Sequence, residues 1–177
     1  MKVSRIPSRI TWAVSQLAVR PSDTVLEIGC GPGRAVGLIC ERLSKGTIVA
    51  IDRSALQVSR ARAINRACLA AGRARVEQLE LLDAPAALGE RAFAKVFAIN
   101  VNAFWTDPSE SFASLSRLVR RGGRAYLFYE PPSASVLRRL QTAMRELLPG
   151  HGFAVEDVRS QRLGTGTALS IVARPGA

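Results

Sequence analysis

Lysine, histidine and cysteine are scarce in this sequence, and each shortage narrows the chemistry available to the chain. Three of its 25 basic residues are lysine, three residues are cysteine and one is histidine. Cys30, Cys40 and Cys68 form no Cys-x-x-Cys pair, and His151 is the one histidine that could join them. Disulfide frameworks use even numbers of cysteines and zinc sites use closely spaced ligand pairs. We therefore expect neither a disulfide framework nor a metal site.

Long apolar runs are also missing, since none reaches the roughly 20 residues that cross a membrane. Residues 1–22 combine basic and apolar residues, as a targeting peptide does. Their apolar positions recur at helical spacing, at Ile6, Ile10, Ala13, Val14 and Leu17. This pattern predicts an N-terminal amphipathic helix instead. Together with the few cysteines, it leads us to expect a soluble protein of the reducing cytoplasm.

Acidic residues are few, and 14 of them against 25 basic residues give a formal net charge of +11. Such a charge favours nucleic acid, anionic membranes or acidic small molecules as partners. The other interpretation is a genome composition that favours arginine codons, because the arginines are scattered from Arg5 to Arg174. We favour composition, and expect a small-molecule partner and no membrane, with nucleic acid as the alternative.

The length of 177 residues fits one domain, in which a core of 23–177 follows the N-terminal helix of 1–22. Apolar segments typical of strands lie at 24–28, 47–51, 76–82, 95–100, 124–129, 153–158 and 168–173. Helical patterns lie between most of them, at 35–43, at 55–71 after a capping Ser54, from Pro108, and at 136–148. The alternation predicts an α/β fold with a seven-stranded, mostly parallel sheet and helices on both faces. The last two strands should form an antiparallel hairpin at one edge.

Three glycines follow the first strand, where the chain turns into a helix. Gly29, Gly31 and Gly33 lack the Cβ that would keep backbone amides away from a ligand. A dinucleotide-binding loop has its third glycine three residues after the second, and here that position is Arg34. The spacing therefore disfavours a dehydrogenase.

The segment Glu27-Ile28-Gly29-Cys30-Gly31-Pro32-Gly33 resembles motif I of the class I S-adenosylmethionine-dependent methyltransferases. The later segments 96–105 and 118–124 resemble small-molecule methyltransferases of this class. The resemblance implies a Rossmann-like fold, S-adenosylmethionine as cofactor and methyl transfer to a small molecule. It also implies that the motif meets the methionine end of the cofactor, through Glu27, Gly29, Cys30, Gly31 and Gly33.

Acidic residues at strand ends supply the rest of the expected cofactor site. Asp52, followed by Arg53, ends the second strand about 20 residues after the glycines, where an acid can bind both ribose hydroxyls. Its alternative role is a solvated turn before the helix from Ser54. In the family that this sequence resembles, an acidic residue after the third strand accepts a hydrogen bond from the adenine amino group. The resemblance therefore implies Asp83 and the adjacent Ala84 at this position. Asp83 before Pro85 is equally typical of a helix N-cap.

Other polar and aromatic residues follow strands at the same edge of the sheet. Asn100 is a further cofactor candidate, and the substrate candidates are Asn102, Phe104 and Trp105, of which the two aromatics could instead pack in the core. No catalytic residue is assigned. Tyr129 and Glu130 could serve as a base if the acceptor needs one, or could simply be strand-end residues. His151 belongs to the opposite end of the sheet.

Three functions remain open at this point. Small-molecule methyl transfer agrees best with the motifs. Nucleic-acid methyl transfer is raised by the charge, and a cofactor-binding module without catalysis would carry the same motif. The acceptor and the oligomeric state are not determined by the sequence.

Overall fold

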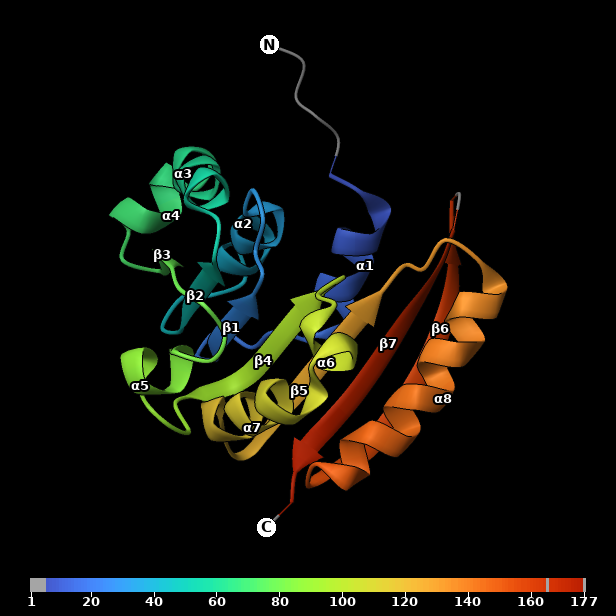
Figure 1. The fold of residues 1–177 in the computed structure, drawn as a ribbon. Coiled ribbons are helices and arrows are strands. Elements are labelled where there is room, and N and C mark those ends of the chain that lie inside the picture. The colour runs from blue at the N-terminus through green and yellow to red at the C-terminus, as the bar shows by residue number, and fades with distance from the viewer. Residues whose placement is uncertain (1–5, 165, 177) are drawn as a thin grey trace.

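The computed structural model describes residues 6–164 and 166–176. The first five residues of the expected N-terminal segment 1–22, position 165 of the expected hairpin, and the last residue of the expected domain lie outside the described residues. Over the described ranges the centre of the molecule is a seven-stranded sheet of order β3-β2-β1-β4-β5-β7-β6 (Figure 1). The strands are β1 (Thr24–Ile28), β2 (Thr47–Asp52), β3 (Ala74–Gln78), β4 (Phe93–Ile99), β5 (Val119–Tyr129), β6 (Phe153–Leu163) and β7 (Gly166–Pro175).

The strand directions confirm the predicted fold class. The first five strands pair in parallel, and β7 pairs antiparallel with both β5 and β6. The helices are α1 (Ser8–Gln16), α2 (Arg34–Cys40), α3 (Ala55–Ile64), α4 (Arg66–Ala70), α5 (Ala84–Leu88), α6 (Ala103–Thr106), α7 (Pro108–Leu118) and α8 (Ala134–Gly150). In the part of the chain that the structure describes, no helix is both long and apolar enough to span a bilayer.

Alternating residues of the strands face two separate apolar clusters, one on each side of the sheet. Leu26 and Ile28 of β1 belong to the cluster covered by α5, α6, α7 and α8, which lie toward the viewer in Figure 1. Val25 belongs to the cluster covered by α1, α2 and α3. The period of two places consecutive side chains on opposite faces. Trp12, Ala13 and Val14 of α1 belong to the second cluster, so the division between 1–22 and 23–177 stays a prediction.

The predicted helix over 55–71 is wrong in one respect, because it is interrupted at Asn65. The side-chain amide of Asn65 donates to the carbonyls of Gly33 (2.9 Å) and Ala61 (2.8 Å). Side-chain bonds of this kind compete with helical backbone bonding. The chain therefore divides into α3 and α4, and Asn65 ties them to the glycine loop.

The third strand was predicted at 76–82, which is too far toward the C-terminus, because β3 spans Ala74–Gln78. β3 ends at Gln78, because its register with β2 stops where Asp52 ends that strand. Residues 79–82 leave the sheet, and Asp83 stands at the N-cap of α5. In contrast, β6 and β7 extend well beyond the predicted 153–158 and 168–173, since they pair as far as Leu163 and Gly166.

Cys40 and Cys68 form a disulfide, which contradicts the expectation from the cysteine spacing. The two residues are 28 positions apart, and the packing of α4 beside the end of α2 brings their Cα atoms to 6.2 Å. The odd cysteine is Cys30, which carries a free, buried thiol. Disulfides are rare in reducing compartments, so the cysteine content no longer supports the expected cytoplasmic location.

Candidate cofactor site

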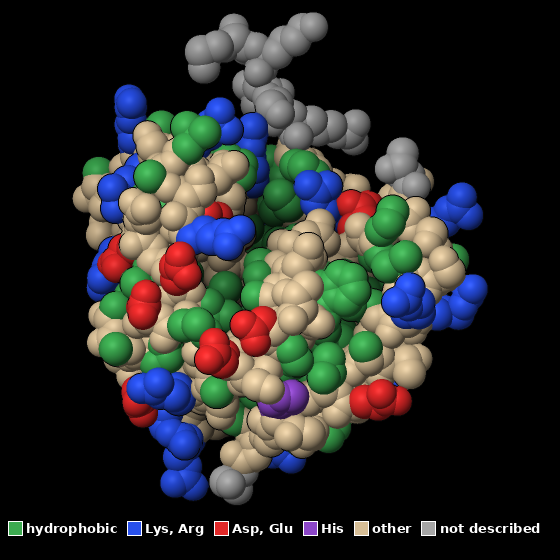
Figure 2. All heavy atoms as spheres, viewed as in Figure 1, with side chains coloured by type: hydrophobic (Ala, Val, Ile, Leu, Met, Phe, Trp, Pro, Cys, Tyr) green, Lys and Arg blue, Asp and Glu red, His purple; other side chains and the backbone are tan. Residues whose placement is uncertain are grey.

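Two adjoining cavities open at the carboxyl ends of the parallel strands, where ligands of open α/β sheets bind. The larger measures about 570 Å³ and the smaller about 160 Å³. Both are lined by Gly29, Ile99 and Asn100, so they form one continuous depression. Figure 2 shows this face of the molecule hollowed above its middle, with apolar side chains in the hollow. The combined shape suits an elongated ligand.

The three glycines of the loop serve different purposes, although all have positive φ. A Cβ added to Gly31 would meet no described atom within 4 Å, so this glycine faces open space in the smaller cavity. A Cβ on Gly29 would lie 2.7 Å from Cγ2 of Val101. One on Gly33 would lie 2.6 Å from Cβ of Ala61 in α3, and Gly33 lines neither cavity. Gly33 is thus a packing residue, and Gly31 is the glycine that leaves room for a ligand.

Asp52 holds the glycine loop in place and also faces the larger cavity. One carboxylate oxygen accepts from the backbone N–H of Gly31 (2.8 Å) and the other from that of Ser54 (2.9 Å). The Ser54 hydroxyl accepts from the N–H of Gln57 (3.4 Å), as the capping pattern predicted. Each carboxylate oxygen retains a lone pair for a ligand hydroxyl. Arg53 lines the same cavity.

Glu27 is a buried carboxyl group at the wall of the smaller cavity. Its Oε2 has no hydrogen-bond partner among the described residues. Burial, with a smaller contribution from the charge of Asp52, raises the pKa of Glu27 to about 8. The same causes, with Glu27 itself, raise the pKa of the Cys30 thiol beside it. A buried acid without a partner is costly unless a ligand completes its hydrogen bonding.

Asn100 connects the ends of two strands and lines both cavities. It adopts a φ of 55°, which is unusual for a residue with a side chain. Its N–H donates to the carbonyl of Phe128 (2.8 Å), and its Oδ1 accepts from the N–H of Glu130 (2.8 Å). These two bonds hold the strained residue in place. Asn102 lines the larger cavity.

Several other predicted site residues are not brought to either cavity. Phe104 is fully buried and packs on Phe112 at 5.5 Å between ring centroids, so the core interpretation describes it. Trp105 is 42% exposed and lines neither cavity. Asp83 and the buried Ala84 also stand outside the lining, because β3 ends early.

The two candidate bases differ in their surroundings. The hydroxyl of Tyr129 donates to the carbonyl of Val101 (3.3 Å), and burial raises the pKa of this phenol. Glu130 pairs with Arg9 and lies beside Gly166 of the hairpin. Neither side chain lines a cavity.

His151 also lines neither cavity, in agreement with its predicted position away from the site. Its Nδ1 lies 2.7 Å from the carbonyl of Leu147, and its ring packs on Phe112.

Sequence reasoning missed two groups of lining residues. Arg9 and Ile10 of α1 line the smaller cavity, although the helical pattern marked only the apolar face of that helix. Glu80, Leu81 and Leu82 line the larger one. If the third strand had been predicted to end at Gln78, Glu80 would have been the first acidic residue after it and a candidate for the site. Among the described residues no cluster of three or more His, Cys, Asp or Glu could hold a metal ion.

Solved structures similar to this one share its fold. The YcgJ protein of Bacillus subtilis superposes with a TM-score of 0.75 at 12% identity, over 96% of this chain and 98% of that one. Geranyl diphosphate C-methyltransferase from Streptomyces coelicolor A3(2), in complex with Mg²⁺, geranyl diphosphate and S-adenosylhomocysteine, gives 0.73 at 15% identity, over 94% and 78%. The fold is therefore that of the class I methyltransferases.

The sequence comparisons establish the family. The family model described as a methyltransferase domain matches residues 20–163, and the chain belongs to this family. It is 25% identical over 126 residues to the uncharacterized methyltransferase YdaC of Bacillus subtilis, covering 70% of this chain. The match spans 65% of the length of YdaC, slightly less than two thirds.

Proposed function

We propose that this protein transfers the methyl group of S-adenosylmethionine to a small-molecule acceptor. The observation that carries the proposal is the buried Glu27, whose Oε2 has no partner among the described residues and whose pKa is raised to about 8. A buried carboxyl group without a hydrogen-bond partner is complementary to a cationic ligand. The cofactor carries such a cation in its α-ammonium group. The open space at Gly31 beside it fits the same end of the cofactor.

The lining residues support a position for the rest of the cofactor. Asp52, with Arg53 beside it, would hold the ribose through its remaining lone pairs. Residues 79–82, with the apolar Leu79 and Leu81, would face the adenine ring. Gly29, Cys30 and Gly31 would follow the methionine chain along the smaller cavity. Asn100 stands where the two cavities meet, so it would lie near the reacting sulfonium.

The cofactor would supply a methyl group on a positively charged sulfonium sulfur, and the neutral thioether that remains is a good leaving group. The acceptor lone pair would form the new bond to the methyl carbon as the sulfur–carbon bond breaks, and S-adenosylhomocysteine would leave. The protein mainly has to align the acceptor at about 3 to 3.5 Å and exclude water. An acceptor that must lose a proton needs a base, and Glu130 is the better candidate because Tyr129 is buried and bonded to Val101.

Two of the basic residues that could guide nucleic acid have other partners in the structure. The guanidinium of Arg62 donates twice to the carbonyl of Val76 (2.9 and 2.7 Å), and Arg159 pairs with Asp157 (2.7 Å). In Figure 2 basic side chains are spread around the visible face and are interleaved with acidic ones. This distribution favours a small acceptor over a polyanion.

The test has two stages. Calorimetry first measures whether the protein binds S-adenosylhomocysteine, with NAD as the negative control. The protein is then incubated with methyl-labelled S-adenosylmethionine and separate small-metabolite, RNA, DNA and protein fractions of a cell extract. Label in the small-metabolite fraction is expected. Label only in a polymer fraction would contradict the proposed acceptor, and binding without any transfer would favour the non-catalytic module.

A further inference from the structure

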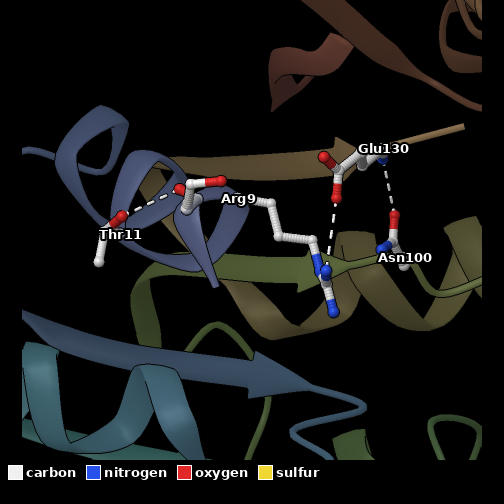
Figure 3. Close-up of polar contacts among 5 residues, drawn as sticks. Arg9, Thr11, Asn100 and Glu130 are labelled. Carbon is white, nitrogen blue, oxygen red and sulfur yellow. Dashed lines mark hydrogen bonds and ion pairs between the residues drawn. The ribbon is translucent and has the colours of Figure 1, made fainter. Parts of the chain in front are cut away.

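Arg9 reaches across the mouth of the smaller cavity to an acid outside it. Its Nη1 lies 3.3 Å from Oε2 of Glu130, so α1 is joined to the end of β5 (Figure 3). The contact is long for a charge-assisted hydrogen bond, for which about 2.7 to 2.9 Å is usual. The side chain of Arg9 is 39% exposed and that of Glu130 19%. Arg9 is therefore the more exposed member of the pair.

Glu130 is held more firmly than its partner. Its backbone N–H donates to Oδ1 of Asn100 (2.8 Å), and one of its carboxylate oxygens lies close to Gly166 at the start of β7. Figure 3 shows Arg9 extending from α1 toward Glu130, with Asn100 on the other side of that residue. A different partner for Arg9 could thus be gained by moving the arginine alone.

The smaller cavity places this guanidinium in the same small volume as Glu27. Arg9 and Glu27 both line the cavity of about 160 Å³, and Glu130 lines neither cavity. A cavity with a buried acid and a partly exposed guanidinium is complementary to a zwitterionic amino acid, whose ammonium needs an acceptor and whose carboxylate needs a planar donor.

We propose that Arg9 binds the α-carboxylate of the cofactor and that Glu130 is an internal competitor for it, occupying Arg9 until the cofactor arrives. This inference rests on the proposed function, because it assigns the methionine end of the same cofactor. Cofactor binding exchanges one carboxylate partner of Arg9 for another, and it leaves Glu130 without its ion pair. The exchange lowers cofactor affinity, since the Arg9–Glu130 contact has to be broken first.

The competition predicts opposite effects for the two members of the pair. Arg9→Gln should weaken S-adenosylhomocysteine binding about tenfold or more, since a hydrogen bond to a charged group is lost. Glu130→Gln should strengthen it severalfold, because Arg9 is then free. In the Arg9→Gln background, Glu130→Gln should have no further effect on affinity.

The decisive probe is S-adenosyl-3-thiopropylamine, which keeps the nucleoside and the ammonium but lacks the carboxylate. Calorimetry with this probe and with S-adenosylhomocysteine is compared for the wild type, both single variants and the double variant. Arg9→Gln should leave the affinity for the amine probe unchanged. Arg34→Gln is the matched control, because Arg34 lines the same cavity.

Three results would overturn the inference. Equal weakening of both ligands by Arg9→Gln would mean that Arg9 only supports α1. A loss confined to S-adenosylhomocysteine in Arg34→Gln, and not in Arg9→Gln, would assign the carboxylate to Arg34. Weakening by Glu130→Gln would exclude competition, and this variant remains informative even if Arg9→Gln fails to fold. Failure of the wild type to bind S-adenosylhomocysteine at all would instead contradict the proposed function.

Discussion

The side chain of Asp52 shapes the glycine loop and also faces the larger cavity. Its two oxygens fix the N–H groups of Gly31 and Ser54, which lie on the two segments that follow β1 and β2. The sequence predicted Asp52 as a ribose acid and left a turn role as the alternative, and the contacts place the carboxylate both in the turn and at the cavity. The two roles are therefore compatible.

Asp52→Ala should weaken S-adenosylhomocysteine binding at least tenfold, since a hydrogen bond to a charged acceptor contributes about 1.5 to 3 kcal/mol. Asp52→Asn is the matched control, because its amide oxygen can still accept from Ser54 while its NH₂ group cannot accept from Gly31. We expect an intermediate loss for Asn, as measured by calorimetry. Unchanged affinity in a folded Ala variant would remove Asp52 from the site.

Glu27 should make the stability of the cofactor-free protein depend on pH. Its folded pKa of about 8 lies above the ordinary value of 4.5. Between these values the folded state binds more protons than the unfolded state, so the free energy of unfolding falls as pH rises, by up to about 1.4 kcal/mol per pH unit. Glu27→Gln should flatten this decline. Urea unfolding at several pH values from 5 to about 8 measures the difference, and parallel profiles would contradict it.

At the scale of the elements, the glycine loop is positioned by its contact with α3. Gly31 and Gly33 share a left-handed backbone, but only Gly33 is in contact with a neighbouring helix. The loop conformation is a local property, whereas its position is set by α3 through Ala61 and Asn65. Two alanine substitutions can separate these effects.

Gly31→Ala and Gly33→Ala should both lose about 1 kcal/mol of stability from the left-handed backbone. Gly33→Ala should lose about 1 to 3 kcal/mol more, because its Cβ overlaps Ala61. Urea unfolding compares the two. Cofactor affinity should fall in Gly31→Ala, although this variant loses only the backbone contribution to stability. Equal stabilities of the two variants would show that α3 shifts to accommodate a Cβ at position 33.

The disulfide is the second link between elements on this side of the sheet. It closes a segment with a sequence separation of 28 residues, for which chain entropy predicts about 3 to 4 kcal/mol of stabilisation. Cys68→Ser should lose about this amount in urea unfolding. The wild type treated with a thiol reductant should match the variant, and the variant itself should not respond. If the reductant does not change the free energy of unfolding of the wild type, the disulfide contributes nothing to stability.

At the scale of the whole molecule, the net charge of +11 is distributed rather than concentrated. Ion pairs engage basic residues on several elements, including Lys95 with Asp23 (3.2 Å) and Arg117 with Glu90 (2.7 Å). Exposed pairs such as that of Arg117 with Glu90 contribute little stability. They do reduce the positive field that a polyanion would meet.

RNA and DNA should accordingly bind weakly and without sequence preference, with Kd in the micromolar range or above at about 150 mM salt. Affinity should fall steeply as salt rises, because binding releases counterions. Titration at several salt concentrations, with labelled methyl incorporation followed in parallel, checks this. Submicromolar binding together with methylated nucleic acid would make the small-molecule acceptor wrong.

The sequence by itself determined the features that depend on neighbouring residues. Strand and helix periodicity defined the α/β sheet and its C-terminal hairpin, and Glu27, Gly31 and Asp52 were identified because the loop and the strand end that carry them are local patterns. The cap at Ser54 followed for the same reason. These predictions required no knowledge of which distant segments touch.

Only the tertiary structure decided what depends on packing between distant segments. The break at Asn65 requires Gly33 as its partner, and the Cys40–Cys68 bridge requires α4 to lie beside α2. Arg9 lines the smaller cavity because α1 packs against α2 and β7, whereas Phe104 lines neither cavity because α6 turns that ring into the core. Such contacts arise from burial of apolar surface across the whole chain, which no local spacing records.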